Sequence, residues 1–203
     1  MGSRIKIDLG RRSLNIMFPD VGINLKIFPR RFHVNSKKEY ELLSMLSSKG
    51  IKVPKPITYI RTRNSSIVVR EFVAGLHFDD VLSSYPIEKL KEVLVNLILE
   101  LRRIEDLGIF VPEFSTLYKN VIVRDTEPYI LDLERSVFSG KSIVTQFLGM
   151  LLRMSKKERM REKLRRILKI EKIKEVAKDY KNTRDIKEVL ALFRENIDAE
   201  QTG

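Results

Sequence analysis

The sequence contains no cysteine, no tryptophan and only two histidines, His33 and His77. Without cysteine, the chain has no disulfide, no thiol nucleophile and no cysteine-based zinc site. Glycine is also scarce, at 9 of 203 residues, and no glycine-rich loop is present. Because two isolated histidines make a poor metal site, a candidate metal site has to be sought among oxygen ligands.

Long apolar runs are absent as well. A membrane span requires about 18 to 20 apolar residues, and the longest run here, near residues 147–152, ends at Arg153. The N-terminus lacks the charged, apolar and small-residue order of a secretory signal. With 43% hydrophobic and 33% charged residues, the composition is that of a globular domain. We therefore expect a soluble, cytoplasmic protein without membrane contact.

Positive charge dominates, with 39 basic against 27 acidic residues and a net charge of +12. The excess lies in residues 1–73 and 151–183, whereas residues 74–150 are net acidic. Such a field favours anionic partners such as nucleotides, RNA or acidic protein segments. For residues 151–183, which read as a basic helix, contact with RNA or the ribosome is one hypothesis. A solvated helix face is the other.

The first third of the chain is typical of strands with a single helix. Short apolar segments predict five strands, at residues 5–9, 14–18, 23–28, 57–60 and 67–73. In residues 23–27, alternation places Asn24 and Lys26 on one face and three aliphatic residues on the other. A helix is expected from residue 35 or 36 to Gly50.

The rest of the chain predicts helices and one inserted hairpin. An apolar stripe indicates a helix over residues 87–104, and a hairpin at residues 121–131 ends in Asp132. Ser155 and Glu158 form a capping-box pattern, and a last helix is expected over residues 185–197. This order predicts an α+β protein of two segregated lobes. We assign residues 1–73 to a strand-rich N-lobe, residues 71–75 to a hinge and residues 76–203 to a helical C-lobe.

Lys26 and Glu39 are the first candidate functional pair. Lys26 lies in a predicted strand, and Glu39 shares a helix face with Leu43 and Leu46 at i+4 and i+7. A strand lysine paired with a helix glutamate and directed at phosphates is the arrangement that protein kinases use. Glu41 is the alternative partner, although it points about 200° away around the helix.

The segments Leu107–Val123 and Tyr129–Glu134 extend this likeness. A long helix ends in glycine, an acid follows at Glu113, and Lys119-Asn120-Val121 precedes the hairpin that leads to Asp132-Leu133-Glu134. In this order the chain resembles RIO-type atypical kinases and an archaeal family of predicted serine/threonine kinases. The resemblance covers roughly residues 20 to 155 and implies a protein-kinase-like fold that binds ATP and Mg²⁺.

The resemblance also implies a role for each matching residue. Lys26 would bind the α- and β-phosphates, Glu39 would orient it, and the backbones of Glu71 and Val73 would hold adenine. Glu113, with Lys119 beside it in the loop, is the catalytic candidate. Asn120 and Asp132 would hold the metal, because Mg²⁺ prefers hard oxygen ligands.

Several departures from the kinase pattern weaken the expected catalysis. Glu113 replaces the usual aspartate, and its extra bond of about 1.5 Å matters because a displacement of about 1 Å can cost about 10²-fold in rate. Glu134 replaces the glycine after the metal-binding aspartate, and Arg70 replaces an apolar residue at the back of the pocket. In place of a glycine-rich loop, the turn Gly10–Ser13 would have to use its arginines as phosphate ligands.

These observations leave several functions open. The first is an ATP-dependent phosphotransferase acting on serine or threonine hydroxyls of an unidentified protein substrate. The second is a pseudokinase that serves as a scaffold or nucleotide sensor. The third is an RNA- or ribosome-associated basic domain, and the fourth is a small-molecule kinase. The oligomeric state is not determined by the sequence.

Overall fold

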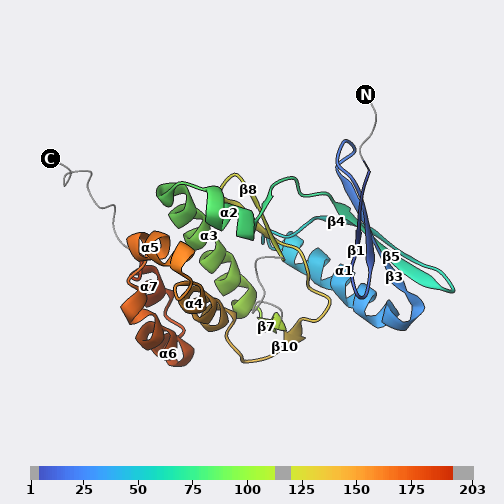
Figure 1. Ribbon diagram of the computed structural model, residues 1–203. Helices are drawn as coiled ribbons and strands as arrows, with labels where there is room; N and C mark the ends of the chain where they lie inside the picture. The colour runs from blue at the N-terminus through green and yellow to red at the C-terminus, as the bar shows by residue number, and fades with distance from the viewer. Residues whose placement is uncertain (1–4, 113–119, 194–203) are drawn as a thin grey trace.

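The computed structural model describes residues 5–112 and 120–193. A strand-rich N-lobe with one long helix lies beside a mainly helical C-lobe (Figure 1). This confirms the α+β arrangement of two segregated lobes. The predicted hinge at residues 71–75 falls in the segment that joins them, but the exact domain boundary stays a prediction. None of the helices in the two described ranges is long and apolar enough to cross a membrane.

The N-lobe is built on a five-stranded sheet with the order β1-β2-β3-β5-β4, in which all neighbours are antiparallel. Its strands are β1 (Lys6–Leu9), β2 (Leu14–Phe18), β3 (Ile23–Pro29), β4 (Pro56–Arg61) and β5 (Ser65–Glu71). All five strands expected in this part of the chain are present. Their ends differ from the expected ones by two residues or fewer.

The two faces of β3 differ in burial. Lys26 and Phe28 are buried, whereas the aliphatic residues Ile23, Leu25 and Ile27 stay partly exposed. The reason is tertiary: helix α1 (His33–Ser48) lies on the side to which Lys26 points, and the Lys26 ammonium contacts Glu39 of that helix. The polar lysine therefore belongs to the interior of the lobe.

Helix α1 begins two or three residues earlier than expected, directly after the short 3-10 helix η1 (Arg30–Phe32). It ends at Ser48, and Gly50 follows with a φ of 69°. Glycine adopts this left-handed conformation without the steric cost of a Cβ, so it allows the chain to leave the helix there. Glu39, Leu42, Leu43 and Leu46 form the buried face, as the heptad spacing predicts.

The connection between the lobes passes close to the C-lobe hairpin. After β5, residues 72–75 lead to β6 (Leu76–His77), which pairs with β8 (Val121–Arg124). A Cβ on Gly75 would lie 2.4 Å from the Val123 carbonyl oxygen, a distance that no side chain tolerates. Glycine at position 75 thus permits the close approach of the connection to β8.

The C-lobe core is organised around helix α3 (Ile87–Asp106), whose apolar face is almost completely buried. The other helical elements are α2 (Phe78–Ser84), α4 (Ile143–Met154), α5 (Glu158–Ile167), η3 (Ile170–Lys172), α6 (Ile173–Thr183) and α7 (Ile186–Leu190). The remaining strands are β7 (Ile109–Phe110), β9 (Glu127–Ile130) and β10 (Val137–Phe138). The sequence did not predict α2 or the two-residue strands.

The C-terminal part corrects three expectations. Residues 151–183 form several helices instead of one basic helix, because Leu168 is extended and pairs with Phe193 in an isolated bridge. Ser155 does not cap α5, since its hydroxyl donates to the Leu152 carbonyl at the end of α4. Helix α7 ends at Leu190, well before residue 197. The last four residues of that expected helix lie outside the described range.

Candidate active site

A cavity of about 460 Å³ opens between the two lobes. Its upper wall comes from the turn between β1 and β2 and from the strand faces of Asn15, Asn24 and Lys26. Its lower wall comes from Asn120 and from the loop after β9, and the connection between the lobes closes one side. The cavity therefore collects nearly all the predicted site residues that the structure describes.

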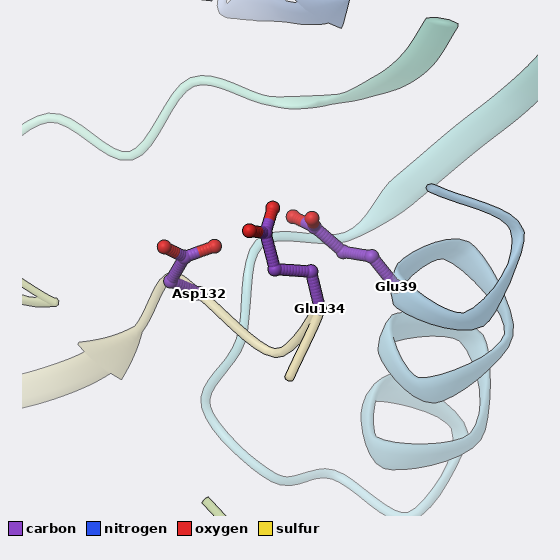
Figure 2. Close-up of side chains that lie close together, drawn as sticks. All are labelled: Glu39, Asp132 and Glu134. Atoms are coloured by element: carbon purple, nitrogen blue, oxygen red, sulfur yellow. The ribbon is translucent and has the colours of Figure 1, made fainter. Parts of the chain in front are cut away.

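The ammonium group of Lys26 is the centre of an ionic network in this cavity. Its Nζ lies 2.7 Å from Glu39 Oε2, 2.5 Å from Asp132 Oδ1 and 3.2 Å from Glu134 Oε2. Figure 2 shows the three carboxylates converging, Glu39 from α1 and the other two from the loop after β9. The expected ion pair between Lys26 and Glu39 is thus present, and the proposed phosphate contact of Lys26 stays a prediction.

Arg70 of β5 connects the helix to this loop. Its Nη1 lies 2.8 Å from Glu39 Oε1 and donates to the Leu131 carbonyl oxygen at 2.7 Å. Arg70 is buried, and so is Glu39, which therefore has one cation on each carboxylate oxygen. The contact holds α1 and the loop after β9 in a fixed relation.

Arg12 joins the network from the opposite side of the cavity. Its Nη1 lies 3.1 Å from Glu134 Oε1, while the other oxygen of Glu134 faces Lys26. We call the six side chains together the cleft cluster: Arg12, Lys26, Glu39, Arg70, Asp132 and Glu134. Three formal positive charges balance three formal negative charges, which compensates the burial of these groups.

The electrostatics of the cluster favour the ionised forms of Lys26 and Asp132. Burial alone would lower the pKa of Lys26, but the charges of Glu39 and Asp132 outweigh it and raise that pKa above its ordinary value. Burial alone would raise the pKa of Asp132, yet the adjacent Lys26 ammonium holds it below its usual range. The site thus keeps a permanent cation next to a permanent carboxylate.

Asn120 and Asp132, the expected metal ligands, lie just outside two neighbouring strands, Asn120 before β8 and Asp132 after β9. The Leu131 N–H donates to the Asn120 carbonyl oxygen at 2.9 Å, which continues the β8–β9 pairing by one step. Strand β9 ends at Ile130, so Asp132 lies two residues beyond the strand instead of at its end. Both side chains line the cavity.

The hinge residues also line the cavity. The Glu71 N–H donates to the Lys55 carbonyl, and the Glu71 carboxylate pairs with Arg124 of β8 at 3.1 Å. Val73 is buried. Glu113 and Lys119 lie outside the described residues. Glu41, the alternative partner of Lys26, is exposed and pairs with Lys37 on the surface of α1.

Sequence reasoning treated Arg70 and Glu134 only as departures from a pattern. In the structure they are partners in one network, Arg70 of Glu39 and Glu134 of Lys26 and Arg12. The available signal was that one extra basic and one extra acidic residue occur together at positions that both face the pocket. From these two opposite charges, one could have inferred that Arg70 and Glu134 belong to an ionic network in the pocket.

The arrangement of lobes and cleft is that of a protein-kinase-like fold, and solved structures agree. WbdD in co-crystal with the kinase inhibitor LY294002 matches with a TM-score of 0.62 and 16% identity, over 91% of this chain and 43% of that chain. Monomeric WbdD matches with a TM-score of 0.63 and 16% identity, over 90% and 44%. This chain therefore spans less than half the length of the WbdD chains, and the likeness shows the fold.

A family model narrows the assignment. The model of the RIO domain matches residues 27–154, more than half of the chain. The chain belongs to the RIO-domain family, as its motifs predict. No curated protein sequence matches it significantly.

Proposed function

We propose that this chain binds ATP and transfers a phosphoryl group to serine or threonine hydroxyls. The observation that carries the proposal is the contact of Lys26 with both Glu39 and Asp132 inside one cavity. Phosphoryl transfer needs a cation on the phosphates, hard oxygen ligands for the metal and a positioned carboxylate. The first two requirements correspond to groups that line this cavity.

The cavity fits a nucleotide in size and in polarity. Its volume lies within the range of about 300 to 1,000 Å³ typical of small-molecule sites. The side-chain oxygens of Asn15 and Asn24 are buried, both residues line the cavity, and neither oxygen has a hydrogen-bond partner among the described residues. Buried polar groups are normally paired, so a polar ligand would satisfy them.

Each residue then has a defined task. Lys26, oriented by Glu39, would bind phosphate oxygens, and Asp132 and Asn120 would hold Mg²⁺. The ion would supply charge neutralisation on the phosphates. The backbones of Glu71 and Val73 would hold the base. Glu113 and Lys119, which lie between the two described ranges, are the proposed catalytic residues.

A pseudokinase is the second candidate, and the cleft cluster itself favours it. Lys26 has Glu134 as a third carboxylate partner, at a position where the kinase pattern has glycine. Each additional ion pair of Lys26 has to be broken before its ammonium group can bind a phosphate. A protein that binds nucleotide without turnover would tolerate this arrangement.

Two measurements on the wild-type protein test both candidates. Mg-ATP at about 100 times its Kd should add about 2.7 kcal/mol to the unfolding free energy and raise the melting temperature. Transfer of labelled phosphate to the protein itself or to a cell extract would support the enzyme. A rise in melting temperature without transfer would favour the pseudokinase, and no change in melting temperature would contradict both.

Asp132→Asn provides the matched control for transfer. The substitution keeps the side-chain shape but removes the charge that would hold the ion. Metal-ion catalysis contributes several kcal/mol, so turnover should fall by about 10³-fold. If the variant transfers phosphate as fast as the wild type, Asp132 is not a metal ligand.

A further inference from the structure

The turn between β1 and β2 presents side chains to the cavity. All four of its residues, Gly10 to Ser13, line the cavity wall. The Gly10 N–H donates to the Ser13 carbonyl oxygen at 2.9 Å, so this amide is used within the turn. The guanidinium groups of Arg11 and Arg12 are then the strongest anion-binding groups that the turn offers.

The two arginines of the turn differ in what they contact. Arg12 reaches across the cavity to Glu134, whose side chain is only 5% exposed. The Arg12 side chain is itself 34% exposed, so it has room to move at the mouth of the cavity. Arg11 is exposed and makes no ion pair within the described part of the chain. Of the two arginines, Arg12 is therefore the one whose guanidinium group contacts a residue of the site.

We infer that Arg12 is a phosphate-binding residue of this cavity, held on Glu134 until a polyphosphate arrives. The inference rests on the proposed nucleotide site and extends it to a residue outside the kinase pattern. Guanidinium groups bind phosphate through short charge-assisted hydrogen bonds, often in pairs. Such a side chain can supply the contacts that backbone amides of a glycine-rich loop supply elsewhere.

Glu134 is the resting partner that makes this arrangement stable. One of its oxygens faces Arg12 and the other faces Lys26, so it bridges these two cations of the cleft cluster. Without Glu134, the Arg12 guanidinium and the Lys26 ammonium would lose the carboxylate that they share. An incoming polyphosphate offers both cations several oxygens, and Arg12 is the more exposed of the two. The site should therefore discriminate polyphosphates from nucleosides.

Titration calorimetry with three probes tests the inference. The probes are Mg-ATP, adenosine and inorganic tripolyphosphate with Mg²⁺, each titrated into the wild type and into Arg12→Gln. Arg12→Gln should weaken Mg-ATP and tripolyphosphate by about tenfold to a hundredfold, the range for charged hydrogen bonds, and leave adenosine unchanged. Arg12→Lys, which keeps the charge but loses the paired geometry, should give intermediate affinities.

Arg63→Gln is the matched control, because Arg63 is exposed in the turn between β4 and β5 and does not line the cavity. It removes the same charge from the same lobe and should change each affinity by no more than about twofold, as expected for an exposed charge. An equal loss in both variants would reduce the effect to overall charge and overturn the inference. Equal weakening of Mg-ATP and adenosine by Arg12→Gln would make Arg12 a structural latch and also overturn it.

The outcomes separate this inference from the proposed function. If the wild type binds Mg-ATP and Arg12→Gln binds it equally well, the inference is wrong while the nucleotide site stands. If the wild type binds tripolyphosphate through Arg12 but neither Mg-ATP nor adenosine, the nucleotide function is wrong and Arg12 is still a phosphate ligand. If Glu134→Gln tightens tripolyphosphate binding, the role of Glu134 as resting partner is supported.

Discussion

Two ionic clusters within residues 5–112 and 120–193 can be compared, the cleft cluster and a second cluster in the C-lobe. In the second, Glu105 of α3 accepts hydrogen bonds from the Ser142 hydroxyl at 2.8 Å, the Val144 N–H at 3.2 Å and the Tyr180 hydroxyl at 3.0 Å. Arg184, which follows α6, also donates to it. Both clusters pair buried carboxylates with cations, so burial by itself does not distinguish them.

The two clusters differ in the groups that their carboxylates contact. Glu105 binds the N-cap residue of α4 and a backbone N–H of its first turn, and thereby fastens α3 to α4 and α6. The acids of the cleft cluster converge instead on one ammonium, with side chains as partners. Side-chain partners can be exchanged for a ligand without unfolding a helix end. We infer that the C-lobe cluster is structural and the cleft cluster functional.

Removal of Lys26 should have the largest effect. Lys26→Met leaves Glu39, Asp132 and Glu134 close together without their common cation, and loss of one partner from a buried ionic network costs about 3 to 5 kcal/mol. Urea denaturation should show this loss in unfolding free energy. Lys37→Met, in the exposed pair with Glu41, should cost less than about 0.5 kcal/mol. Similar values for the two variants would contradict the central role of Lys26.

Glu105→Gln should be nearly as destabilising. The substitution keeps the shape but weakens charge-assisted hydrogen bonds to Tyr180 and Arg184, with an expected cost of about 3 kcal/mol. Because Glu105 lies outside the cleft cluster, the folded variant should bind Mg-ATP as the wild type does. Thermal denaturation and calorimetry measure the two quantities separately. A loss of Mg-ATP affinity without a loss of stability would show that the two clusters are coupled.

Arg70→Met should cost somewhat less, about 2 kcal/mol, because Glu39 keeps Lys26 as its other partner. The variant also breaks the link from Glu39 to the Leu131 carbonyl. Helix α1 should then exchange its amide hydrogens faster than in the wild type, whereas α3 should not. Arg61→Met on the exposed edge strand β4 serves as the control. Unchanged exchange in α1 would mean that packing of Leu43 and Leu46 alone positions the helix.

The smallest effect on stability is expected for the basic surface at residues 151–183, which we propose as an RNA contact. Reversing the charges of Arg161, Arg165 and Lys169 should alter stability by less than about 0.5 kcal/mol each, as is usual for surface positions. The slope of the logarithm of RNA affinity against the logarithm of salt concentration should become shallower by about one unit for each phosphate contact removed. Filter binding over a range of salt concentrations measures the slope.

Three reversals in the N-lobe, at Lys37, Arg61 and Arg63, are the control for overall charge. They should leave the salt slope of RNA binding close to that of the wild type. If both triple variants bind RNA as the wild type does, the basic residues of α5 and the segment after it are a solvated surface.

Local patterns were sufficient for much of the fold. Short apolar segments predicted the five N-lobe strands, and helical spacing predicted the long helices α1 and α3, because each of these two helices buries one face along its length. Helix α2 and the two-residue strands β6, β7 and β10 were missed. A two-residue strand has no period to detect, and it forms only where a distant segment offers its backbone.

Sequence patterns were enough to select Lys26, Glu39 and Asp132 as candidate site residues, because of their positions in a strand, a helix and a loop. Beyond the ion pair of Lys26 with Glu39, the sequence could not decide which of the charged residues are partners. Lys26 meets a carboxylate 106 residues away, Arg12 one 122 residues away, and Arg70 a carbonyl 61 residues away. Such contacts arise only when the two lobes close on each other, because an ionic partner is chosen by distance and burial in the folded chain. Packing of α1 against β3 made Lys26 interior, and the approach of the two lobes turned two apparent departures, Arg70 and Glu134, into partners of the site.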